Sequence, residues 1–275
     1  MFNLTQIKLY FPLFIIISFL FPSTSISSSS ELNQQNNSVS ISGVNSQLSF
    51  NFPEPNIYTL QEELNLWSTY YYIHEATTIE GEETFPLLDY NYQPLGIELS
   101  HKDWCYSALQ GTVRIFDENN NYHTYNYHER GELQQADCSE FFSSLSEETL
   151  ERMSRNLFRP VDSPYGDGTD GFILLPYRSI AVDTNLMPLG TVIYIPSARG
   201  VEITLPSGQS VTHDGYFFAA DIGSAIQGNK IDTFLGIDKR NPFSHVLSRQ
   251  TGTFQAFIVN DPNIKATLTN AHLPF

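Results

Sequence analysis

The sequence predicts a mainly β protein that closes into a small barrel and carries a few short helices. Short apolar or β-branched runs recur from residue 171 to residue 259, and glycines separate them. Only one long segment has the apolar period of a helix, and no solenoid-type repeat is present. Many short strands joined by unequal turns are typical of small β-barrels.

The N-terminal residues read as an export signal rather than a folded element. Lys8 precedes the apolar run LYFPLFIIISFLFP, which is short for a membrane span, and small residues suited to cleavage follow. We expect residues 1–27 to be a signal peptide, with an uncleaved anchor as the alternative. The mature protein is then secreted, periplasmic or outer membrane-associated, without stable membrane insertion. Residues 28–56 are rich in Ser, Asn and Gln and read as a polar linker.

Residues 57–98 are expected to form an N-terminal extension that packs on the barrel. Within it, Gln61–Trp67 reads as a short helical turn. Ser68–Ile73 reads as a strand because it is aromatic and β-branched. Tyr70-Tyr71-Tyr72 and, further on, Trp104 are candidate sugar-stacking platforms, although aromatic side chains in β structure more often pack in the core.

Residues 99–275 are expected to form the barrel domain, with a helical insertion near 144–158. Asp103–Leu109 reads as a short helix capped by Asp103, and the following apolar and aromatic runs read as a hairpin. A Ser-x-x-Glu capping box at Ser144 opens the clearest helix, which is expected to continue to Phe158. Six later runs read as strands: FILLPY, SIAV, TVIYIP, VEITL, YFFAAD and TFQAFIV.

The chain has two cysteines, Cys105 and Cys138, both in the part expected to be exported. In an oxidising compartment an even pair reads as one disulfide, with two separate buried thiols as the alternative. A zinc site is not supported, because the two cysteines are far apart and no close His pair accompanies them. We expect neither a metal nor another cofactor.

The net charge of the chain indicates which classes of binding partner to expect. There are 14 Lys and Arg against 30 Asp and Glu, a formal net charge of −16. Such a chain repels phosphate backbones, so nucleic acid is not an expected partner. The sequence also lacks the Gly-x-Ser-x-Gly motif of serine hydrolases, a Gly-rich nucleotide loop and the His-Glu-x-x-His metal motif.

Three aspartates occupy positions that an ordinary core does not explain. Asp183 and Asp221 each close a run of small or apolar residues, and Asp232 follows eleven residues after Asp221. A carboxylate at the end of a buried strand is costly to desolvate, so a hydrogen-bonding or chemical role is expected. The loop Gly-Ser-Ala-Ile-Gln-Gly between the last two acids would let them face one cleft.

Two segments around these acids, AVDTNLMPLGTVIYIP and ADIGSAIQGNKIDTFLG, resemble the three-aspartate (3D) domain. This is the catalytic part of the membrane-bound lytic transglycosylase A family. The resemblance covers about 171–236 and implies a six-stranded double-psi β-barrel with a substrate groove across one face. The family's second, inserted domain is not matched, and residues 28–90 show no likeness to it.

The resemblance implies a peptidoglycan lytic transglycosylase, which breaks the MurNAc–GlcNAc bond and leaves 1,6-anhydroMurNAc. Asp232 then corresponds to the catalytic acid/base, Asp221 to an acid that shapes the site, and Asp183 to a supporting, more structural residue. His213, Gly223 and Ser224 are candidate substrate contacts, with a polar turn as the alternative for His213. Asp232 should have a raised pKa, since burial and a neighbouring carboxylate both favour its protonated form.

Two other classes remain open. One is a glycoside hydrolase acting on another polysaccharide, with Asp221 as the base that activates water. The other is a non-catalytic glycan-binding or interaction module, since one barrel carries different chemistries. In each case the expected partner is peptidoglycan or another polysaccharide, and a partner protein that completes the groove is a further option.

Overall fold

The computed structural model describes residues 49–81, 83–117 and 121–274. The expected signal peptide and most of the expected linker lie outside these residues. Six strands form a closed barrel in the order β1-β13-β8-β12-β9-β14. They are β1 (Leu60–Tyr71), β8 (Ser179–Ala181), β9 (Val192–Tyr194), β12 (Tyr216–Asp221), β13 (Lys230–Phe234) and β14 (Phe254–Val259). This closed six-stranded barrel confirms the predicted fold class.

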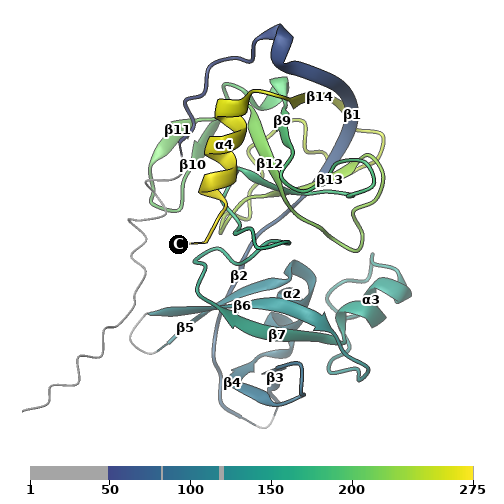
Figure 1. Cartoon of the computed structure of the whole chain (residues 1–275). Coiled ribbons are helices and arrows are strands. Elements are labelled where there is room, and N and C mark those ends of the chain that lie inside the picture. Colours follow the sequence, from purple (N-terminus) through teal and green to yellow (C-terminus); the bar gives the residue numbers. More distant parts are fainter. Residues whose placement is uncertain (1–48, 82, 118–120, 275) are drawn as a thin grey trace, which may run out of the picture. The chain divides into compact units, whose positions relative to one another are not determined.

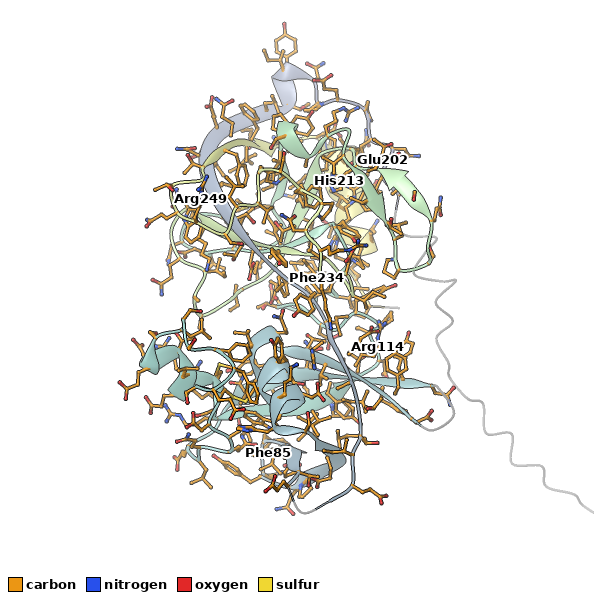
Figure 2. The ribbon with its side chains drawn as sticks, turned by 180° about the vertical axis from the view of Figure 1, so that it is seen from behind. Phe85, Arg114, Glu202, His213, Phe234 and Arg249 are labelled. Atoms are coloured by element: carbon orange, nitrogen blue, oxygen red, sulfur yellow. A yellow bond between two sulfur atoms is a disulfide. The ribbon has the colours of Figure 1, made fainter. Side chains whose placement is uncertain are left out.

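The barrel mixes parallel and antiparallel neighbours. β1 pairs with β13 in parallel, and β12 pairs with β8 in parallel. The four remaining contacts around the ring are antiparallel. Its core is strongly aromatic: Phe217 and Phe218 on β12 are fully buried. Phe234 on β13 is also fully buried (Figure 2). A closed barrel leaves no unpaired sheet edge, and it holds short strands such as β8 in a fixed register.

Helix α4 (Pro262–Ala271) follows the last barrel strand (Figure 1). Asp261 caps it by accepting from the backbone amides of Asn263 and Ile264, and Pro262 stands at its first turn, where a missing N–H costs nothing. Its buried residues Ile264 and Leu268 belong to the barrel core. A separate hairpin pairs β10 (Glu202–Thr204) with β11 (Ser210–Thr212). The expected strand VEITL is thus found outside the barrel.

Between β1 and β8 the chain builds a second sheet, in the order β2-β5-β6-β7, and a two-stranded hairpin, β3-β4. Helix α2 contacts β2 and β5. The core of this part centres on the fully buried Trp104 and Phe158, so Trp104 is a core residue and not a sugar platform. Its elements are β2 (His74–Thr77), β3 (Phe85–Leu88), β4 (Pro94–Leu99), α2 (His101–Gln110), β5 (Thr112–Phe116), β6 (Tyr122–Arg130), α3 (Glu147–Met153) and β7 (Asn156–Val161).

The expected disulfide between Cys105 and Cys138 is present and closes a segment of 33 residues. It joins α2 to the loop before α3, and both cysteines lie in the Trp104 core. A covalent loop of this size restricts the unfolded chain and contributes about 3–4 kcal/mol in the chain-entropy model. The described chain holds no helix long and apolar enough to cross a membrane.

Several local expectations are corrected. The predicted helical turn at Gln61–Trp67 is part of β1, so the expected extension supplies a barrel strand and does not only pack on the barrel. The predicted helix at 144–158 is shorter, because Ser146 caps α3 and residues from Asn156 pair with β6. Helix α2 is capped by Ser100 and not by Asp103. The run FILLPY forms turns and an isolated bridge.

The first described residues form a strap over the barrel, which we define as Ser49–Asn56. The buried Arg178 and Asp214 form an ion pair of 2.6 Å, and Arg178 also donates to the carbonyl of Ser49. The Phe52 amide donates to Asp214 at 3.0 Å, and the Phe50 ring lies 4.0 Å from the Arg178 guanidinium. This part of the expected linker is therefore ordered by the barrel. The described chain also contains two short 3-10 helices, η1 (Ile57–Thr59) and η2 (Pro196–Ala198).

Candidate active site

Asp221 and Asp232 lie on either side of one residue of β8. Asp221, the last residue of β12, pairs with Ala181, and Asp232 in β13 pairs with the same Ala181 from the other side. Neighbouring strands are separated by about 4.8 Å, so the two aspartate backbones are about 10 Å apart. The barrel therefore brings together the two acids that the sequence predicts to face one cleft.

Asp232 has few partners for its negative charge. Its Oδ1 accepts a hydrogen bond of 2.7 Å from Thr69 Oγ1, on the paired strand β1. Protein surrounds most of the carboxyl group, which stays partly accessible. Burial, opposed by Thr69 and Lys230 and reinforced by the charge of Asp221, raises the pKa of Asp232 to about 7. The carboxyl group is then largely protonated in mildly acidic solution and about half protonated at pH 7.

Asp221 is better supplied with donors. Tyr71 Oη donates to its Oδ2 at 3.1 Å, while Thr169 Oγ1 and the Ile222 amide donate to its Oδ1 at 3.0 and 2.9 Å. Burial raises the pKa of Asp221 to about 6, and these three donors oppose the rise by favouring the anion. Because Asp221 has three donors and Asp232 one, hydrogen bonding favours the anion more strongly at Asp221 than at Asp232.

One face of β1 completes the site. Trp67, Thr69 and Tyr71 alternate along this strand and are all half-buried, and their cross-strand partners on β13 are Lys230, Asp232 and Phe234. The charges of both aspartates act on Tyr71. Together with burial, they raise the pKa of its hydroxyl well above the ordinary value, so the hydroxyl remains a donor. In the sequence, Tyr71 is a candidate only as part of a run of possible stacking residues, and no pattern predicts Thr69 or Thr169 as a site residue.

Asp183 has a different environment from the other two aspartates. Its Oδ2 accepts from the Gly228 amide at 2.7 Å, and its Oδ1 accepts from the Asn185 amide at 2.9 Å. These donors lower the pKa of Asp183 below its ordinary value. Since Gly228 ends the loop that links Asp221 to Asp232, Asp183 ties this loop to the end of β8. Its contacts are those of a supporting residue.

The other candidate contacts divide into two groups. Gly223 and Ser224 lie in the loop between the two acids, Gly223 half-buried and Ser224 exposed, so both are near the site. His213 is fully buried: its Nε2 bonds to the Tyr177 carbonyl at 2.8 Å and its Nδ1 accepts from the Gly215 amide. Burial lowers the pKa of His213 to about 3. His213 is therefore too deeply buried to contact a substrate, and its hydrogen bonds give it a structural role.

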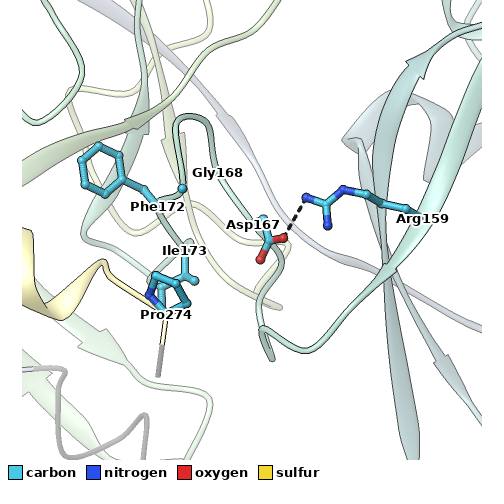
Figure 3. Close-up of a pocket in the computed structure, with 7 residues that line it drawn as sticks. Arg159, Asp167, Gly168, Phe172, Ile173 and Pro274 are labelled. Atoms are coloured by element: carbon cyan, nitrogen blue, oxygen red, sulfur yellow. Dashed lines mark hydrogen bonds and ion pairs between the residues drawn. The ribbon is translucent and has the colours of Figure 1, made fainter.

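The loop that carries Thr169 also borders a small cavity of ≈160 Å³ (Figure 3). Arg159 and Asp167 form an ion pair of 2.8 Å beside it, and Phe172, Ile173 and Pro274 supply apolar surface. None of the three aspartates lines this cavity, so it is separate from the acid pair. Within residues 49–274, as far as the structure describes them, no three His, Cys, Asp or Glu side chains gather in a way that could hold a metal ion.

The two aspartates of the site belong to a segment with a recognisable pattern. Residues 178–252 match the 3D domain. This match confirms the resemblance predicted from the two aspartate motifs, and it includes Asp183, Asp221 and Asp232. The matched 3D domain supplies β8, β9, β12 and β13 of the barrel, whereas β1 and β14 come from outside it. No curated protein sequence matches the chain.

Solved structures similar to this chain include three lytic transglycosylases. E. coli MltA with bound chitohexaose is 17% identical, with a TM-score of 0.46 over 71% of this chain and 72% of that one. A membrane-bound lytic murein transglycosylase from Agrobacterium tumefaciens is 14% identical, with a TM-score of 0.45 over 73% and 75%. MltA from Neisseria gonorrhoeae is 12% identical, with a TM-score of 0.45 over 73% and 74%.

Proposed function

We propose that the protein is an exported enzyme that cleaves cell-wall glycan, and that it acts as a peptidoglycan lytic transglycosylase. The observation that carries the proposal is the pair of aspartates on either side of Ala181, where burial raises the pKa of Asp232 to about 7 and that of Asp221 to about 6. The resemblance of residues 178–252 to the 3D domain supports it.

In the first half of the reaction, Asp232 acts as the acid. Its carboxyl proton passes to the oxygen of the MurNAc–GlcNAc bond, the bond from this oxygen to C1 of MurNAc breaks, and GlcNAc leaves as an alcohol. Positive charge develops at C1 and the ring oxygen. A carboxylic acid with a pKa of about 7 is suited to this step, because a large share of it carries the proton near neutral pH and releases it readily.

In the second half, the same group acts as the base. The Asp232 carboxylate accepts the proton of the MurNAc C6 hydroxyl, and O6 forms the new bond to C1. This gives 1,6-anhydroMurNAc without consuming water and restores protonated Asp232. Asp221 supports both halves, because its negative charge favours protonation of Asp232 and stabilises the positive charge that develops on the sugar.

The separation of the two acids favours one alternative. Backbones about 10 Å apart leave room for a water molecule between the carboxyl groups, as inverting glycoside hydrolases require. In that reaction Asp221 takes a proton from water while Asp232 protonates the leaving oxygen, and the product is a reducing sugar. The two reactions use the same acid and differ in their products.

The test is mass spectrometry of peptidoglycan digested by the mature protein, by Asp232→Asn and by Glu202→Gln. Glu202 is an exposed carboxylate in the β10-β11 hairpin, which makes it a matched control (Figure 2). Anhydro-muropeptides from wild type and Glu202→Gln, with a loss of about 100-fold or more in Asp232→Asn, support the proposal. Reducing-end products indicate the hydrolase. Glycan binding without products from any of the three proteins indicates a binding module.

A further inference from the structure

A lysine and a tryptophan lie next to Asp232 on the same side of the β1-β13 pair. Trp67 pairs with Lys230, and Thr69 pairs with Asp232. Side chains two residues apart on a strand share a face and are about 7 Å apart. Lys230 Nζ lies 5.1 Å from the centroid of the Trp67 ring. The ammonium group is therefore fixed beside the acid that is proposed to break the glycan.

Lys230 is held in place without being neutralised by a close partner. Its Nζ donates to the Ala225 carbonyl at 3.3 Å, in the loop that joins Asp221 to Asp232. Among the described residues no carboxylate oxygen lies within 4.0 Å of this nitrogen, since the ion pairs of the described chain do not include Lys230. A lysine ammonium has three N–H donors, and a single acceptor leaves two of them for a ligand.

The Lys230 ammonium group is a positive charge in a strongly negative chain. The chain has a formal net charge of −16, so its overall field repels anions. A cation held over an indole face keeps its charge and loses part of its freedom, because the ring attracts the ammonium without accepting its protons. Its charge also opposes the rise in the pKa of Asp232, which shows that the two groups interact. A single fixed cation next to two acids is suited to recognising one negatively charged group.

We propose that Lys230, positioned by Trp67, is a specificity-determining residue that binds a carboxylate carried by the sugar next to the scissile bond. This inference rests on the proposed function and names the substrate class more narrowly, as an acidic glycan. In peptidoglycan such carboxylates come from the stem peptides, and from the lactyl group of any MurNAc that bears no peptide. A neutral glycan of the same length would still reach Asp232, but it would leave the ammonium unpaired.

The experiment compares one glycan in two forms. Peptidoglycan strands are used with their carboxylates free, or with the same carboxylates converted to methylamides. Cleavage and binding of both forms are measured for wild type, Lys230→Gln, Lys230→Arg and Lys265→Gln. Lys265 is an exposed lysine on α4 and serves as the matched control. The quantity of interest is the ratio of the two forms, because any general effect of Lys230 on Asp232 cancels in that ratio.

We expect wild type to prefer the free-carboxylate strands by about tenfold, as a hydrogen bond between charged groups provides. The preference should weaken as salt is added, vanish in Lys230→Gln, and persist in Lys230→Arg and Lys265→Gln. Equal use of both strands by wild type, or an unchanged preference in Lys230→Gln, overturns the inference while leaving the proposed function intact. If neither form is cleaved, the proposed function fails, and the binding ratio still decides the role of Lys230.

Discussion

Thr69 Oγ1 donates a hydrogen bond of 2.7 Å to Asp232 Oδ1 across the parallel pair β1-β13. This bond favours the ionised form of Asp232, whose pKa is nevertheless raised to about 7 by burial. Thr69→Val keeps the shape of the side chain and removes the donor. We expect the pKa of Asp232 to rise by about one further unit, measured by carboxyl-carbon NMR titration.

Thr69→Ser is the matched control, because it retains the hydroxyl and loses only a methyl group. Its titration should follow wild type. If Thr69→Val also titrates as wild type does, Thr69 does not set the protonation of Asp232, and burial alone accounts for the raised pKa.

The raised pKa of Asp232 also predicts how stability depends on pH. An aspartate with a pKa of 3.8 when unfolded and about 7 when folded binds more protons in the folded state between these values. Its contribution to stability therefore falls as pH rises from about 4 to about 7. Asp232→Asn removes this effect, so the variant should match wild type at pH 4 and exceed it at pH 8 by roughly 2–4 kcal/mol.

Thermal unfolding at both pH values measures this difference. Glu202→Gln, which changes an exposed carboxylate in the β10-β11 hairpin, should follow wild type throughout. A gap between Asp232→Asn and wild type that does not change with pH would mean that Asp232 is ionised in the folded protein at pH 4 already.

Asp183 provides a separate prediction about the loop between the acids. Its carboxylate accepts from the Gly228 amide, and the lowered pKa keeps it ionised. Asp183→Ala should leave the barrel folded while amide exchange in residues 223–229 becomes several-fold faster. Asp183→Asn retains an acceptor and should show a smaller increase. Unchanged exchange in Asp183→Ala, measured by hydrogen–deuterium exchange, would remove the supporting role.

The strap at Ser49–Asn56 is predicted to stabilise the barrel. Phe50 lies over the Arg178 guanidinium and the Phe52 amide donates to Asp214, so loss of the strap uncovers a buried ion pair. A chain that starts at residue 57 should be less stable than one that starts at residue 49 by about 2 kcal/mol, or about 4–8 °C in Tm. Equal Tm values would show that the strap contributes nothing to the barrel.

The sequence alone predicts the acid pair, because the spacing from Asp221 to Asp232 is a local pattern. It also predicts the disulfide, since two cysteines in a chain that is expected to be exported have one pairing available. Thr69 was not predicted as a site residue, and Tyr71 was a candidate for sugar stacking but not for contact with Asp221, because their aspartate partners are more than 140 residues away along the chain. Only the register of β1 on β13 brings them to the site.

Two other corrections have local physical reasons. The stretch Gln-Glu-Glu-Leu-Asn at the start of β1 has helical propensity, and its pairing with β14 overrides that propensity. The strap was read as a linker because Ser, Asn and Gln dominate residues 28–56. The alternation of Phe50 and Phe52 was the signal that an extended segment with one apolar face lies there.

The position of β1 in the barrel has a consequence for how the chain folds. Strand β1 is the first barrel strand to be synthesised, yet its two neighbours, β13 and β14, are among the last elements of the chain. The second sheet and its disulfide lie wholly between β1 and β8, so their partners are all present early. Assembly should therefore begin in this inserted part, while β1 remains unpaired until the C-terminal strands arrive. Interrupted synthesis would leave a folded insertion without the barrel that holds Asp221 and Asp232.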